Sequence, residues 1–362
     1  MQEIVRNPIL AEYDAKKVLH EEFCSKVAGL LSDIVKQNGI VVNSIDSRVK
    51  EESSLAYKVE NSEGKYKSLE DITDVSGIRI ITYFSDDVDR IAERIQEEFI
   101  IDSFNSVDKR TKLDPDRFGY LSLHYVVSLN SQRTILPEYQ RFEDLKVEIQ
   151  IRSILQHAWA EIEHDLGYKN KNAVPKVVRR DFSRLAGILE LADEEFIRIR
   201  ENLDIYNSQI QSEIERTNAN VLIDKISLNS LIETRESIIN EIDKEISEMA
   251  SGRLGEVHER QLNVYVERLK YLGFNTLDEV LSSLEKYKNK IVKFAGIWIT
   301  GERNYFTEGI SLFYLAYILL ADNEDMEAFK MYLKKFRIGG TTNKDKETLA
   351  KDIMSIYINQ VK

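Results

Sequence analysis

The stretch Val147-Glu148-Ile149-Gln150-Ile151-Arg152 decides the fold. Apolar residues alternate in it with an acid, an amide and a guanidinium, which is the pattern of a strand with one buried face. Because the stretch lies among other apolar segments, the apolar side predicts a sheet core. We interpret the polar side as the floor of a site that handles a metal and phosphates.

The segments around this strand predict an α+β domain. Apolar residues recur at helical spacing in some segments, and β-forming residues cluster in others. After Ser153 the strand signal disappears, so an all-α C-terminal region is expected. The expected elements before that point are helices over 8–38 and 85–99, strands over 77–84, 120–129 and 145–152, and a loop over 103–118.

Length and composition suggest how the chain is divided. Its 362 residues correspond to about two domains of roughly 150 residues each. We expect an α+β domain over residues 1–205, a polar helical connector over 206–255 and a helical C-terminal domain over 256–362.

Composition also excludes several classes of protein. The net charge of −12 argues against a general basic surface for nucleic acid, although it allows a local basic pocket. The single cysteine, Cys24, excludes an intramolecular disulfide and a cysteine-rich zinc site. Residues 1–17 carry acids and no long apolar core, and the longest apolar run, 313–320, is too short to span a bilayer. A cytoplasmic protein without membrane contact is therefore expected.

A basic segment follows the first helix. Arg48, Lys50, Ser54 and Lys58 lie where the chain either continues a strand or starts a helix. On a helix, positions 50, 54 and 58 share one face, and their cationic and hydroxyl groups suit a polyphosphate. The alternative is a solvated basic face, which is the commoner role of such a run.

Two charged residues flank or interrupt the predicted central strand. Asp74 precedes the strand and is well placed to hold a hard cation such as Mg²⁺. Arg79 lies inside the strand and needs an anionic partner or a planar ring. A structural carboxylate would satisfy Arg79 as well as a ligand would.

A second polar face is expected on the strand before residue 145. Tyr120, Ser122 and His124 share one side of that strand, and Tyr120 can stack on a base. The alternative is a hydrogen-bonded Tyr and His on an ordinary half-exposed strand. Glu148, facing the same cleft, can ligate Mg²⁺ or take a proton from a hydroxyl.

One further spacing superficially suggests zinc. His157, Glu161 and His164 share a face of the helix that follows Arg152. The H-E-x-x-H order is absent and no cysteine supports the site, so we expect a supporting role or an ordinary polar face.

Together these residues resemble the synthetase domain of the RelA/SpoT family, which makes the alarmone (p)ppGpp. The resemblance runs from Arg48 to Lys169, and its tail is more similar to the small alarmone synthetases than to the long bifunctional enzymes. It rests on five motifs in order: R-x-K-x3-S-x3-K, D-V-S-G-I-R, G-Y-x-S-x-H, V-E-I-Q-I-R and W-A-E-I-E-H-D-L-x-Y-K.

The resemblance implies a nucleotidyltransferase-like mixed β-sheet flanked by helices. It implies transfer of pyrophosphate from ATP to the 3′-hydroxyl of GDP or GTP, with Mg²⁺ as cofactor. The implied ATP-binding residues are Arg48, Lys50, Ser54, Lys58 and Arg79, and the implied metal ligands are Asp74 and Glu148. Glu148 would also be the catalytic base, and the acceptor-binding residues would be Tyr120, Ser122, His124, Gln150 and Arg152.

Two other functions stay open. Toxin-type relatives pyrophosphorylate the 3′ end of tRNA or adenine nucleotides, and Phe118 replaces a residue that is polar in many relatives, which puts the acceptor in doubt. A basic loop at Lys109, Arg110, Lys112 and Arg117 would suit guanosine phosphates or an RNA backbone. The other alternative is a non-catalytic nucleotide-binding regulator, against which the presence of Asp74 and Glu148 argues.

Residues 206–362 lie outside the matched motifs. One hypothesis is a regulatory domain that restrains a toxic synthetase in phage defence and responds to a protein ligand. The other is a scaffold for a homo-oligomer. The aromatics Trp298, Tyr305, Phe306 and Tyr314 would serve either role or build a helical core, which is their commonest use.

Overall fold

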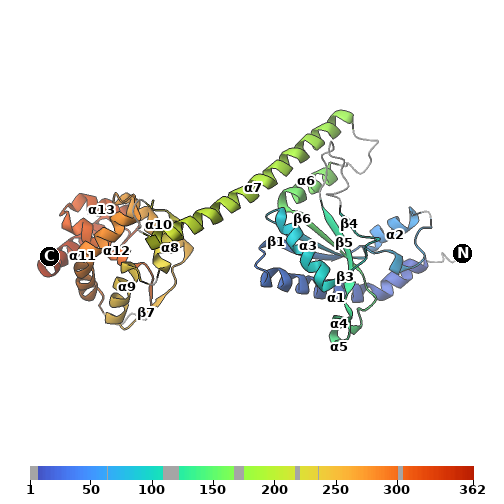
Figure 1. The fold of residues 1–362 in the computed structure, drawn as a ribbon, viewed down its shortest axis with the longest axis horizontal. Helices are drawn as coiled ribbons and strands as arrows, with labels where there is room; N and C mark the ends of the chain where they lie inside the picture. The colour runs from blue at the N-terminus through green and yellow to red at the C-terminus, as the bar shows by residue number, and fades with distance from the viewer. Residues whose placement is uncertain are drawn as a thin grey trace. The chain divides into compact units, whose positions relative to one another are not determined.

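The computed structural model describes residues 7–62, 64–108, 122–166, 175–216, 221–234, 236–300 and 305–362. The chain divides into two compact units, Met1–Glu201 and Asn202–Lys362. Each unit is described by itself, with the element labels of Figure 1.

The first unit is built on a mixed sheet. Its strands are β1 (Val42–Val49), β2 (Ser76–Thr82), β3 (Phe99–Ile101), β4 (Val107–Asp108), β5 (Leu123–Leu129) and β6 (Val147–Ser153). Their order is β1-β2-β6-β5-β3, with β4 paired to β5. Only the β2–β6 pair is parallel among these described strands; the other pairs are antiparallel. The predicted α+β class with a mixed sheet is confirmed.

Helices of the first unit pack around this sheet, with α1 and α3 on its apolar face. They are α1 (Pro8–Gln37), α2 (Glu52–Glu60), a 3₁₀ turn at Leu69–Asp71, α3 (Asp86–Glu98), α4 (Ser131–Thr134), α5 (Pro137–Gln140) and α6 (Ile154–Asp165). The apolar stripes of α1 and α3 meet the sheet in one core, seen beside the strands in Figure 1. Val147, Ile149 and Ile151 are fully buried there. The alternation in β6 therefore has the predicted effect: its apolar side enters the core and its polar side faces away from α1 and α3.

The helix α7 (Lys176–Arg216) is fixed to the first unit by polar contacts. The Ser153 hydroxyl, at the end of β6, donates to the Asp193 carboxylate at 2.7 Å, and both residues are buried. Burial is the main reason that the pKa of Asp193 rises to about 6. Arg200 lies over the Phe84 ring and pairs with Asp86. These contacts tie α7 to the carboxyl ends of β6 and β2.

The second unit is helical apart from one small sheet. Its elements are α8 (Lys225–Glu233), α9 (Ile238–Met249), β7 (Arg253–Gly255), α10 (Glu259–Tyr271), α11 (Leu277–Trp298), β8 (Tyr305–Thr307), α12 (Ile310–Asp322), α13 (Met326–Lys335), α14 (Asn343–Ile356) and a π-helical turn at Tyr357–Val361. The sequence did not predict the parallel pair β7–β8, because three residues are too few to show a period.

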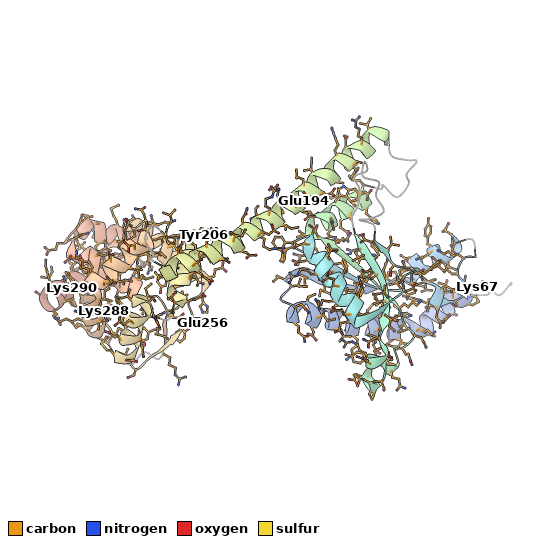
Figure 2. The ribbon with its side chains drawn as sticks, in the orientation of Figure 1. Lys67, Glu194, Tyr206, Glu256, Lys288 and Lys290 are labelled. Atoms are coloured by element: carbon orange, nitrogen blue, oxygen red, sulfur yellow. The ribbon has the colours of Figure 1, made fainter. Side chains whose placement is uncertain are left out.

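Most of the expected connector belongs to the core of the second unit. Leu228, Ile239, Ile242 and Ile246 are fully buried in that core, so residues 225–255 form part of the unit and do not bridge separate domains. The polar composition of this segment suggested a connector because α8 and α9 each bury only one side and keep polar residues on the other. Tyr206 on α7, labelled in Figure 2, donates a hydrogen bond to Asp224, the N-cap of α8.

The aromatics of the second unit mostly build its core. Phe306 and Tyr314 are buried, Trp298 stacks on Phe294 at 5.7 Å between ring centroids, and Tyr305 is exposed. Lys290, labelled on α11 in Figure 2, bonds the Tyr357 hydroxyl at 2.7 Å. None of the described helices has both the length and the apolar character needed to cross a bilayer.

Candidate active site

A pocket opens on the polar side of the sheet, between β1, α2, β2 and β6. It encloses about 930 Å³ of empty space, open solvent included. It brings together most of the residues predicted for the ATP and metal sites. The lining residues are Asp46, Ser47, Arg48, Val49, Lys50, Glu51, Ser54, Asp74, Gly77, Ile78, Arg79, Glu148 and Gln150.

The strand register explains why these side chains meet. The parallel pair aligns Gly77 with Glu148 and Arg79 with Gln150. On the other side, β1 aligns Arg48 with Gly77. Residues in register across neighbouring strands point to the same side of a sheet. Gly77 has no side chain, so the space between Arg48 and Glu148 stays open.

One carboxylate and two lysines form a charge cluster just before the start of β2. The Asp74 carboxylate pairs with Lys50 at 3.0 Å and with Lys58 at 2.7 Å. Burial raises the pKa of Asp74, but the hydrogen bond from Lys58 and the charge of Lys50 outweigh burial and hold that pKa below its usual value. Asp74 is therefore ionised at neutral pH, and the cluster retains one net positive charge.

The prediction that Lys50 shares a helical face with Ser54 and Lys58 is wrong. Helix α2 begins at Glu52, so Lys50 lies between β1 and the helix and does not share a helical face with Ser54 and Lys58. A backbone hydrogen bond from Lys50 N to the Val75 carbonyl, 2.9 Å long, keeps Lys50 against the start of β2. Lys50 thus reaches Asp74 from the strand side and Lys58 reaches it from the helix side.

Glu148 is held by donors from two strands. His124 Nδ1 lies 2.9 Å from one Glu148 oxygen, and Gln150 Nε2 donates to the other at 3.1 Å. Burial raises the pKa of Glu148, yet the hydrogen bond from His124 and then that from Gln150 hold it below the ordinary value, against the charge of Asp74. Glu148 is consequently ionised at neutral pH and fixed in direction.

Ser122 and His124 are less accessible than the predicted acceptor role suggests. His124 Nε2 lies 2.7 Å from the Ser122 hydroxyl. Ser122 is fully buried and His124 is 9% exposed. In this geometry the two residues orient Glu148, and their contact with an acceptor stays a prediction.

Arg79 and Arg152 meet one carboxylate on α6. The Glu161 oxygen Oε1 lies 3.1 Å from Arg79 Nη1 and 3.2 Å from Arg152 Nη2. Arg79 is thus satisfied by a carboxylate of this chain, as one of the two interpretations expected. Arg152 is buried and is not among the residues that line the pocket.

Two predicted features lie outside the described residues. Tyr120, expected to stack on the acceptor base, is one of them, and the basic loop at Lys109, Arg110, Lys112 and Arg117 is the other. Conversely, Asp46 lines the pocket and was not predicted. It stands two residues before Arg48 in β1, so strand periodicity alone places it on the same side.

The pocket's donor set fits a magnesium ion that shares its ligands with a substrate. Asp74 and Glu148 both line the pocket, and the charge of Asp74 raises the pKa of Glu148, a repulsion that a cation between them would relieve. Within the described ranges no group of three or more His, Cys, Asp or Glu residues could hold a metal. Mg²⁺ commonly binds one or two carboxylates and completes its shell with phosphates and water.

Comparisons with known proteins agree with this geometry. A family model described as a region found in RelA / SpoT proteins matches residues 47–173. The chain is 31% identical over 160 residues to GTP pyrophosphokinase YjbM of Bacillus subtilis (strain 168), a match that covers 44% of this chain and 72% of that protein. The chain belongs to the RelA/SpoT family.

The chain is also similar to two further proteins. GTP pyrophosphokinase YwaC of the same organism is 31% identical over 135 residues, which is 37% of this chain and 61% of that protein. The crystal structure of small alarmone synthetase 2 from Bacillus subtilis is similar with a TM-score of 0.45 and 26% identity, over 53% of this chain and 99% of that one. The predicted membership of the RelA/SpoT family is confirmed. The expected class of enzyme, a pyrophosphotransferase, agrees with the names of both pyrophosphokinases.

The hydrogen bond between His124 and Glu148 predicts a pH effect. Replacing His124 by alanine removes a donor that lowers the pKa of Glu148, while burial continues to raise that pKa. We therefore expect the pKa of Glu148 to rise. Because the predicted catalytic role of Glu148 needs the ionised carboxylate, the acidic limb of the kcat/KM pH profile should move to higher pH.

The matched control is His164→Ala, which removes an exposed histidine from α6. Its acidic limb should coincide with that of the wild type. An acidic limb that stays in place in His124→Ala would contradict the electrostatic role assigned to His124.

Proposed function

We propose that this enzyme transfers pyrophosphate from ATP to the 3′-hydroxyl of GDP or GTP. The observation that carries the proposal is the pairing of a cationic cluster with an ionised, oriented carboxylate in one pocket. Lys50 and Lys58 supply positive charge on one side, and Glu148 supplies the carboxylate on the other. Pyrophosphate transfer depends mainly on positioning and on neutralising spreading negative charge.

ATP binds, in this proposal, against β1, α2 and β2. Its phosphates replace Asp74 as partners of Lys50 and Lys58, and the Ser54 hydroxyl on α2 adds a donor. Arg48 and Arg79 contact the base or the phosphates; a guanidinium can both stack on a ring and bind oxygen in a fork. Asp74, released from the lysines, becomes available to a magnesium ion.

The magnesium ion would be held by Asp74 and Glu148 together with ATP phosphates, and when bound it neutralises charge and acidifies the acceptor hydroxyl. Glu148 and Gln150 face the acceptor across the open space above Gly77. Glu148 orients the 3′-hydroxyl and receives its proton. The hydroxyl oxygen bonds to the β-phosphorus of ATP, the bond from that phosphorus to the α–β bridging oxygen breaks, and AMP leaves.

A guanine nucleotide is the acceptor that the relatives favour, since both matched proteins are named GTP pyrophosphokinases. Tyr120, which lies outside the described residues, is predicted to stack on the acceptor, and a stacked ring would add affinity for any base. Transfer to tRNA ends or adenine nucleotides is therefore tested beside transfer to GDP and GTP. The assay incubates the full chain and Mg²⁺ with β-phosphate-labelled ATP and each acceptor in turn.

Glu148→Gln should lower the rate of transfer at least ~10²-fold, the low end for loss of a general base. The isosteric amide keeps the size of the side chain and removes its charge. Glu138→Gln, which changes an exposed acid on α5, is the matched control and should retain wild-type turnover. Near-full turnover by Glu148→Gln would refute the mechanism, and label that enters no acceptor would refute the function.

The second unit has a regulatory role in our proposal. It has its own hydrophobic core and it lies outside the family match. A regulatory unit that restrains the synthetase fits this independence, and a protein ligand would be its signal.

Expression of residues 1–205 beside the full chain tests this role. If the second unit restrains synthesis, the short chain should inhibit growth strongly and the full chain should not. The Glu148→Gln version of the short chain is the control, because its effect on growth should vanish with catalysis. Equal growth with active short and full chains would leave only the role of a scaffold.

A further inference from the structure

Glu161 on α6 joins the pocket to a helix that has no residue in the pocket lining. Its oxygen Oε1 accepts from Arg79 Nη1 at 3.1 Å, and Arg79 belongs to the lining. Residues 79 and 161 are far apart in the sequence, so the contact forms only when α6 packs beside β2. The contact orients one end of the Arg79 guanidinium, and the Arg79 side chain remains 29% exposed.

Two further side chains lie near Glu161 Oε1. Arg152 Nη2 lies 3.2 Å from it and His157 Nδ1 lies 3.5 Å from it. Arg152 is 3% exposed, so its charge needs a nearby anion. Burial lowers the pKa of His157, and the charge of Arg152 lowers it further. His157 is therefore neutral at neutral pH, and Glu161 is an anionic partner of both guanidinium groups.

The strand register brings the two arginines close enough to share this contact. The parallel pair aligns Arg79 with Gln150 and Ile81 with Arg152. Arg152 therefore lies on the strand next to Arg79, on the same side of the sheet and two residues further along. Their like charges repel unless an anion lies between them. Glu161 supplies an anion to both arginines from α6.

We infer that Glu161 is a positioning residue for the donor nucleotide: it holds Arg79 against the pocket wall in the orientation that ATP meets. This inference rests on the proposed function, because Arg79 is assigned to ATP there. Ordering a long side chain before the ligand arrives removes that cost from binding. Glu161 itself need not touch ATP.

The test separates ATP from the acceptor. Glu161→Ala should raise KM for ATP by about fivefold to tenfold, the effect of ordering one or two long side chains on binding. The kcat at saturating ATP and the KM for GDP should each change less than about twofold by the same reasoning. A merely structural loss would instead lower activity with both substrates and lower Tm in proportion.

Two variants control for folding. Glu161→Gln keeps an acceptor oxygen for Arg79 and removes the charge, so it should fold and should show an intermediate KM for ATP. Asp165→Asn removes an exposed carboxylate from the end of the same helix and should keep the wild-type KM. If Glu161→Gln and Asp165→Asn both match the wild type, the inference is wrong.

A double-mutant cycle identifies Arg79 as the residue through which Glu161 acts. In the Arg79→Ala background, Glu161→Gln should have no further effect on affinity for a non-hydrolysable ATP analogue. An unchanged effect in that background would overturn the inference. Because the cycle measures binding, it remains decisive if no acceptor is pyrophosphorylated; that result would refute the proposed function alone.

Discussion

The parallel pairing of β2 with β6 is the constraint on which the site depends. It sets Gly77 beside Glu148 and Arg79 beside Gln150, and it buries the alternate residues of both strands in a single core. A shift by one residue would turn every polar side chain into that core. The register that stabilises the first unit is therefore the same register that builds the pocket.

Within the pocket, the charge of Asp74 is balanced by partners that a substrate can replace. Asp74 neutralises lysines that ATP phosphates would otherwise attract, and its pKa is lowered by those lysines. Glu148 is held by His124, which in turn contacts the Ser122 hydroxyl. Both residues are buried, so this support for Glu148 stays in place. One side of the pocket can thus exchange partners while the other keeps its orientation, as transfer between two bound nucleotides requires.

Strand periodicity was enough to predict much of this arrangement. Val147, Ile149 and Ile151 are buried as their alternation indicated, and Glu148 and Gln150 face the pocket with Arg79. The position of Lys50 was mistaken because helix and strand patterns overlap at the start of α2. The contact of Glu161 with Arg79 could not be foreseen, since no local pattern specifies which carboxylate a helix brings to a distant strand. For the same reason, the polar helices α8 and α9 resembled a connector until their single buried sides met a common core.

The exchange of partners at Asp74 is tested most directly by the effect of Mg²⁺ on the affinity for a non-hydrolysable ATP analogue. Calorimetry on the wild type, Asp74→Asn and the exposed control Asp144→Asn provides the comparison. Mg²⁺ should strengthen binding to the wild type and to Asp144→Asn by about tenfold or more, and it should add little for Asp74→Asn, which lacks the anionic ligand that the ion prefers. An equal gain from Mg²⁺ in all three proteins would contradict the account.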